Sequence, residues 1–268
     1  MKMKVEYDVP LSRNVHHLGR LEIPGGGQVV IQGNYAYVGH MKPPHGTSII
    51  DISDPAAPKV VSQIEPPEWS HTHKVRVAGD IMITNVEQDR RHFLRKGDKI
   101  PALRAAGKTD AEIAGEIGVT LEDIPDLDAA RERGYDGGGF RVWDISDKTA
   151  PKLLSYVKTH GFGTHRFDMD ENYAYISTEM EGYVGNILVI YDLADPSNPA
   201  EVSRWHMPGQ HVAAGETPTG VGYSHRLHHA MRVGDEFWAA VWHAGLRVLD
   251  ASDITKPKLT GSYVWPKA

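Results

Sequence analysis

The sequence predicts an all-β fold, a β-propeller built from four-stranded antiparallel blades. A phrase that starts with an apolar run ending in Asp occurs four times, with Asp51, Asp144, Asp192 and Asp250 as its markers. Each copy continues through an Asp-containing turn to a proline and an alternating apolar run, the pattern of strand, turn and strand. Another hairpin-like segment precedes each copy, and repeat units of about 45–50 residues with four strands are typical of propellers.

The spacing of the repeats divides the chain into blades. We predict a single propeller domain over 1–268, with four visible blades at 27–65, 71–158, 163–206 and 225–265. The marker Asp residues are 93, 48 and 58 residues apart, so the second blade must contain an insertion between its second and third strands.

The insertion, 90–136, has the pattern of helices rather than strands. Ala111, Ile113, Ala114 and Ile117 fall on one helical face, and Gly118 suits the end of that helix. We expect these helices to form a lid over one face of the propeller or a contact between subunits.

A further strand is predicted near the N-terminus, at 18–23. With four blades already complete, this strand has no blade of its own to finish, and an open sheet edge invites pairing with another chain. We therefore expect the four blades to belong to a larger ring, or to a homo-oligomer in which another chain completes the ring.

Composition excludes several classes of protein. The 29 basic and 35 acidic residues give a net charge of −6, which argues against nucleic-acid binding. No cysteine is present, so disulfides and thiolate metal sites are excluded. Apolar runs are shorter than the roughly 20 residues of a membrane helix, and the N-terminus lacks a signal-peptide pattern. We expect a cytoplasmic protein that binds a small-molecule substrate, and no nucleic acid or membrane.

Histidines recur at one position of the repeat. In each blade, a turn joins the first two strands. Seven residues before this turn lie His73, His165 and His228 in three blades, and Gly27 in the first blade. The first strand of a blade is the innermost, so these rings are expected to converge on the propeller axis. We predict that they bind a divalent metal ion, which could be iron, manganese, zinc or copper.

Glutamates are predicted to support two of these histidines. Seven residues after the same turns lie Glu87, Glu179 and Trp242. Residues symmetric about a turn face each other across antiparallel strands, so we expect Glu87 beside His73 and Glu179 beside His165. Each carboxylate would orient its ring, bind the metal itself or act as a base.

Three more side chains complete the predicted catalytic group. His71 precedes His73 by two residues on the same strand face and is a candidate ligand or base. Arg166 and Arg226 neighbour the aligned histidines. They either bind an anionic group of the substrate or pair with the glutamates.

The repeated phrase, x-I-x-D-I-S-D-P-x-x-P-K-x-V, resembles the LVIVD-repeat family, and all four copies match it. This resemblance implies a propeller, commonly with more than four blades. A more distant similarity to selenium-binding proteins and carotenoid oxygenases implies axial histidines that hold a metal. By that similarity we expect an iron-dependent oxidoreductase or oxygenase acting on a small organic substrate.

Two other functions stay open at this point. The same ligands suit Lewis-acid chemistry with zinc or manganese, as in a lyase or a hydrolase. Alternatively, propellers often serve as non-catalytic interaction scaffolds, and the aligned histidines would then only stabilise the blades.

Overall fold

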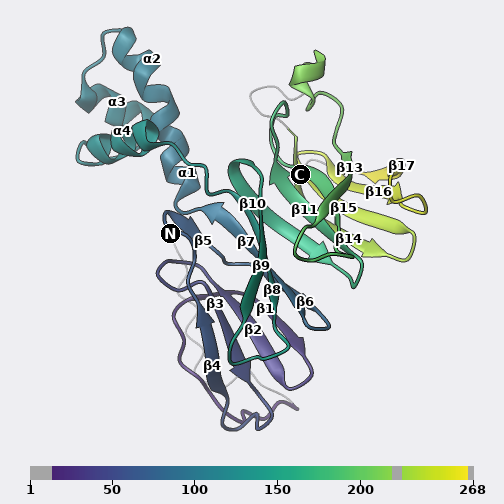
Figure 1. The fold of residues 1–268 in the computed structure, drawn as a ribbon. Helices are drawn as coiled ribbons and strands as arrows, with labels where there is room; N and C mark the ends of the chain where they lie inside the picture. Colours follow the sequence, from purple (N-terminus) through teal and green to yellow (C-terminus); the bar gives the residue numbers. More distant parts are fainter. Residues whose placement is uncertain (1–13, 219–224, 265–268) are drawn as a thin grey trace.

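A computed structural model describes residues 14–218 and 225–264 (Figure 1). The prediction of a cytoplasmic location rested on the N-terminal sequence, and residues 1–13 lie outside the described residues. Residue 265, the last of the predicted fourth blade, also lies outside them. Within the described ranges, no helix has the length and apolar character needed to cross a membrane.

The strands form four blades of four antiparallel strands, which confirms the predicted propeller fold. The first two blades consist of β1 (Gly26–Gln32), β2 (Tyr35–His40), β3 (Thr47–Asp51) and β4 (Lys59–Ile64), then β6 (Val75–Ala78), β7 (Ile81–Gln88), β8 (Gly139–Asp144) and β9 (Lys152–Lys158). The last two consist of β10 (His160–Met169), β11 (Tyr173–Glu179), β12 (Ile187–Asp192) and β13 (Ala200–Trp205), then β14 (Arg226–Val233), β15 (Glu236–Trp242), β16 (Gly245–Asp250) and β17 (Lys258–Tyr263).

The innermost strands contact one another in series, β1 with β6, β6 with β10, and β10 with β14. The first and fourth blades lie at opposite ends of this series (Figure 1). Completion of a larger ring by another chain stays a prediction.

The marker Asp of each repeat stabilises the turn that follows it through a side-chain hydrogen bond. Its Oδ1 accepts a hydrogen bond from the backbone N–H two residues later, at 2.7–2.9 Å in all four blades. A second Asp, three residues further on, accepts in the same way. These bonds explain why the phrase needs Asp at both positions, because the short side chain satisfies backbone donors that the turn leaves unpaired.

The hydrophobic core lies between successive blades. Tyr37 of the first blade packs in one buried cluster with Met82 and Trp143 of the second. Between the third and fourth blades, the rings of Tyr175 and Phe237 meet edge-on with centroids 4.8 Å apart. Each blade therefore depends on its neighbours for burial, as expected for stacked repeats.

The predicted strand at 18–23 is wrong, because these residues form no strand. Leu21 and Ile23 instead pack against Ala36, Val38 and Ile50. The segment covers the outward apolar face of the first blade with side chains, so it needs no hydrogen-bonded partner strand.

The insertion is helical, as predicted. It contains α1 (Arg91–Leu94), η1 (Arg95–Lys99), α2 (Ile100–Ala105), α3 (Asp110–Ile117) and α4 (Asp123–Arg133). Thr109 and Glu112 form a capping box at the start of α3, and Gly118 ends the helix at φ 65°. Buried Ile100, Ile113 and Leu127 give these helices a core of their own.

Figure 1 shows α2, α3 and α4 standing out to one side of the sheets, with α1 nearest the strands. The role of this insertion as a lid or a subunit contact stays a prediction.

A buried histidine makes the first blade sensitive to acid. His40 is fully buried, with Nδ1 on the Pro24 carbonyl and Nε2 on Ser48 Oγ at 2.8 Å, and burial lowers its pKa. The unfolded chain therefore binds a proton below about pH 6.5 that the native protein does not.

We expect the free energy of unfolding to fall as the pH drops below 6.5, with His40 contributing up to about 1.4 kcal/mol per pH unit. Denaturant unfolding of His40→Gln between pH 7 and 5 should show a shallower slope than the wild type. His17→Gln, which changes an exposed histidine, is the matched control; an equal slope in both variants would contradict the assignment.

Candidate metal centre

The candidate site lies where the innermost strands depart from regular pairing. Register shifts between Thr164 and Arg166, and between Leu227 and His229, place His165 and His228 in β-bulges. In the second blade the innermost strand is interrupted, because β5 (Ser70–His71) and β6 both pair with β7 and His73 lies between them. Such irregularities re-aim side chains, and they are common beside functional sites.

The four rings form a row. Ring centroids are 4.2 Å apart for His71 and His73, 6.0 Å for His73 and His165, and 5.4 Å for His165 and His228. The three aligned histidines predicted from the repeat therefore do come together, with His71 added at one end. Gly27 cannot be replaced by a fourth histidine, because even a Cβ there would lie 2.6 Å from the His73 carbonyl oxygen.

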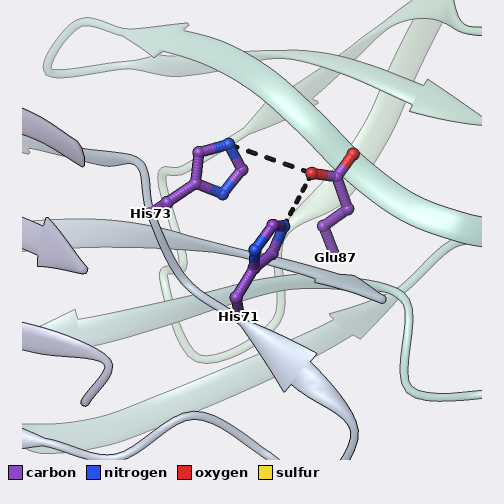
Figure 2. A group of neighbouring side chains, drawn as sticks. All are labelled: His71, His73 and Glu87. Carbon is purple, nitrogen blue, oxygen red and sulfur yellow. Dashed lines mark hydrogen bonds and ion pairs between the residues drawn. The ribbon is translucent and has the colours of Figure 1, made fainter. Parts of the chain in front are cut away.

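Glu87 is the centre of the contacts around this row. Its Oε2 lies 2.9 Å from His71 Nε2 and 3.9 Å from His73 Nε2 (Figure 2). Its Oε1 lies 3.1 Å from His165 Nδ1 and 2.8 Å from Arg91 Nη1. The carboxylate thus connects two blades and the insertion while being only 1% exposed.

The environment keeps Glu87 ionised. Burial alone would raise its pKa, but hydrogen bonds to His165 and His71, and the positive charge of Arg91, outweigh burial and lower the pKa well below its usual range. A fully buried carboxylate is stable as an anion only with such partners.

Two rings of the row are held neutral at physiological pH. Burial lowers the pKa of His73 to about 2. Burial, followed by the charge of Arg166, lowers the pKa of His228 to about 4. Neutral imidazoles keep a nitrogen lone pair, which is the form that binds a metal ion.

The side chains placed for metal binding are His71, His73 and Glu87, each offering one ligand atom, and these atoms lie within 4.8 Å of one another. Two atoms that are each about 2.1 Å from an ion can be at most about 4.2 Å apart. The distances of 2.9 and 3.9 Å from Glu87 to the two rings satisfy this limit. This group could hold a metal ion.

This set differs from the predicted ligands His73, His165 and His228. His165 lies against Glu87, but through Nδ1 and on the other carboxylate oxygen. His228 lies beyond it and accepts a hydrogen bond from Arg166 Nε at 3.0 Å. His71, predicted as an extra ligand or base, belongs to the group instead.

The predicted pairing of glutamates with histidines is wrong in register. Glu179 pairs with His160 rather than His165, accepts from the backbone N–H of Phe162, and forms an ion pair with Arg95. Glu87 opposes His71 in strand register, but its Oε2 also lies 3.9 Å from His73 Nε2, so the predicted neighbour of Glu87 is confirmed.

Trp242 opposes Arg226 in strand register, while its ring packs edge-on against His228 with the centroids 5.4 Å apart. The irregularities at the histidines cause these shifts, since an extra residue in one strand moves every later pair.

Two arginines of the site were missed from the sequence. Arg91 in α1 pairs with Glu87 four residues earlier, and Arg95 pairs with Glu179. The spacing of four residues between Arg91 and Arg95 was a usable signal, because such residues share one side of a helix.

A glycine allows the second and third blades to join beside Glu87. Glu87 pairs with Gly163 at the single bridge between β7 and β10. Gly163 has φ +88°, and an added Cβ would lie 2.4 Å from the Val86 carbonyl oxygen. His165 follows Gly163 by two residues, so this close approach brings the His165 ring to the Glu87 carboxylate.

Replacing Glu87 should destabilise the protein strongly. Glu87→Gln removes the buried charge that pairs with Arg91, and we expect a loss of about 3 kcal/mol in the free energy of unfolding of the metal-free protein. Glu201→Gln breaks an ion pair with Arg204 that is more exposed, and should cost less than about 1 kcal/mol. Equal losses in denaturant unfolding would show that Glu87 does not hold this region together.

Three solved structures of similar fold are longer than this chain, which covers 50–54% of each. A Bacteroides uniformis protein assigned as a 6-phosphogluconolactonase matches with a TM-score of 0.54 and 11% identity, over 88% of this chain and 54% of that one. The Pseudomonas aeruginosa periplasmic gluconolactonase PpgL gives 0.49 and 10% identity, over 86% and 54%. The N-terminal domain of Nup159 gives 0.46 and 8%, over 94% and 50%.

This chain therefore spans about half the length of these structures, and the first of them supports the fold. A search of curated proteins found no match. The LVIVD repeat itself is matched at 26–65, 135–159, 168–206 and 234–264, about half of the chain. These four matches contain the marker Asp residues and the turns they tie, and the chain belongs to the LVIVD repeat family.

Proposed function

We propose that this protein is a metal-dependent enzyme whose ion is bound by His71, His73 and Glu87. The observation that carries the proposal is the orientation of His71 towards Glu87. Its Nδ1 lies 3.3 Å from the Met41 carbonyl oxygen, which accepts a hydrogen bond when the ring proton is on that nitrogen. Its Nε2 then faces Glu87 Oε2 at 2.9 Å.

That short contact is explained by a proton on Nε2 that the ring donates to the carboxylate, or by a metal ion that both atoms bind. With the ring proton on Nδ1, the Nε2 lone pair would face a carboxylate oxygen, which is repulsive. Either a second proton or a metal ion relieves this repulsion. A histidine whose far nitrogen donates to a backbone carbonyl is the usual arrangement of a metal ligand.

His73 is the weaker ligand of the three. Its Nδ1 lies 3.4 Å from the Asn85 amide nitrogen, and bonds to Lys74 N and Thr164 O fix the orientation of that amide. Binding through Nε2 requires a proton on Nδ1, where it would face another donor. We therefore assign the larger share of metal affinity to His71 and Glu87.

Two histidines and one carboxylate with open positions form the ligand set of many iron oxygenases, and this supports the lean towards an oxidoreductase that uses iron. When bound, the ion would supply a Lewis acid or, as iron, a centre for oxygen chemistry. His165 bonds Glu87 through Nδ1, while its Nε2 bonds none of the described residues. We assign His165 as the group that carries a proton to or from the substrate.

The same three ligands favour a second function, a zinc-dependent hydrolase or lyase. Two histidines and a glutamate also bind zinc in known hydrolases. The metal that restores activity separates the two functions.

Metal content tests the proposed site directly. We expect about one ion per chain in protein loaded with iron or zinc, measured by mass spectrometry after desalting. His71→Ala should weaken binding by more than the roughly 10–100-fold that loss of a supporting group costs, and His73→Ala should weaken it less. His206→Ala, outside this group, is the control, and wild-type protein that retains no ion would refute the proposal.

Oxygen consumption separates the two reaction classes. With small organic substrates, the iron-loaded protein should consume oxygen, and the zinc-loaded protein should not. Turnover that needs zinc and proceeds without oxygen would instead support the hydrolase or lyase.

A further inference from the structure

Two arginines beside the histidine row have no carboxylate partner. No carboxylate of residues 14–218 and 225–264 lies within ion-pair distance of Arg166 or Arg226. The two glutamates that could have paired with them are already engaged by Arg91 and Arg95 from the insertion. The alternative left open by the sequence, pairing with Glu87 or Glu179, is therefore not realised.

Arg166 keeps most of its hydrogen-bonding capacity. Its Nε donates to His228, and the guanidinium has four further N–H groups. Those four N–H groups bond none of the described residues. A planar guanidinium in this state binds a carboxylate or phosphate through two parallel hydrogen bonds.

The surroundings add positive charge. Lys74 is buried, and its ammonium group lies near the Arg166 guanidinium. Arg226 is half-buried near Arg91 and Arg95, whose charges lower its pKa further after burial. Glu87 and Glu179 balance only two of these five cations, so the site has an excess of positive charge.

A cavity of about 490 Å³ lies beside His228, the ring that Arg166 contacts. It is lined by His228, Val241, Trp242, Leu246 and Val264, among others, so its walls are mainly apolar. His228 accepts the hydrogen bond from Arg166, and Trp242 is the cross-strand partner of Arg226. Each arginine is thus one contact away from the cavity wall.

We propose that the substrate of this site is an organic anion, with its carboxylate or phosphate held by Arg166 and Arg226 and its apolar part in the cavity beside Trp242. The inference deepens the proposed metal-dependent function, since it names the class of substrate that would lie next to the ion. Anion binding itself does not need the metal, so the two proposals can fail separately.

A wholly inorganic anion fits these observations less well. It would use the arginines but leave the apolar walls in water, with Trp242 54% exposed. An apolar group placed there removes that surface from water, which contributes roughly 25 cal/mol per Å². A neutral apolar molecule, in turn, would leave the excess positive charge unbalanced.

Calorimetric titration of the full chain, freed of metal, tests the proposal with three probes: phenylacetate, the neutral phenylacetamide and inorganic phosphate. Phenylacetate should bind at least tenfold more tightly than phenylacetamide, and more tightly than phosphate. Arg166→Gln and Arg226→Gln should each weaken phenylacetate binding by about tenfold and abolish most of its advantage over the amide.

Two further variants keep the test decisive. Arg204→Gln makes the same charge change in β13, at an arginine that pairs with Glu201, and should leave all three affinities unchanged. Trp242→Ala removes a largely exposed side chain and should weaken both aromatic probes while sparing phosphate.

No binding at millimolar phenylacetate, or an advantage over the amide that survives in both arginine variants, would overturn the proposal. Phosphate binding as tight as that of phenylacetate would overturn the role of the cavity. If the anion binds as expected but the chain retains no ion after loading with iron or zinc, the metal proposal alone is refuted.

Discussion

A buried carboxylate that must stay ionised constrains the centre of this molecule. Glu87 is removed from water, so its charge has to be balanced by groups that the fold brings to it. His71 comes from an interruption in the innermost strand, His165 from the next blade, and Arg91 from the insertion. Three parts of the chain that are distant in sequence are thereby fixed at one point.

The insertion has an electrostatic role at this point. Its first turns supply Arg91 and Arg95, which pair with Glu87 and Glu179. Because these pairs use the available carboxylates, the arginines of the blades keep their hydrogen-bonding capacity. The remaining helices have a core of their own and stand away from the strands. The site therefore requires the first turns of the insertion, because the positions of Arg91 and Arg95 decide which carboxylates are paired and which arginines of the blades are not.

The repeat and its irregularities have different consequences. The repeated Asp-containing turns give every blade the same strand order, and burial between blades makes the array cooperative. The histidines occupy the positions where the innermost strands bulge or break. A regular strand would point successive side chains to opposite faces, whereas these irregularities let neighbouring blades present their rings in one row.

The sequence by itself determined the fold class, the four repeats, the helical insertion and the register of His73, His165 and His228. These follow from local chemistry, because turn residues, apolar periodicity and repeat spacing act over a few residues at a time. The same local reasoning placed a strand at 18–23, where the apolar residues serve only to cover a blade.

Only the tertiary structure decided which groups meet. A bulge shifts the pairing of all residues beyond it, so Glu179 lies beside His160 although symmetry about the turn pointed to His165. The choice of Arg91 and Arg95 as partners of the two glutamates depends on the path of the insertion, which no repeat encodes. Charge balance at a buried site is a property of the assembled fold, since it sums contributions from segments that approach one another only when the blades pack.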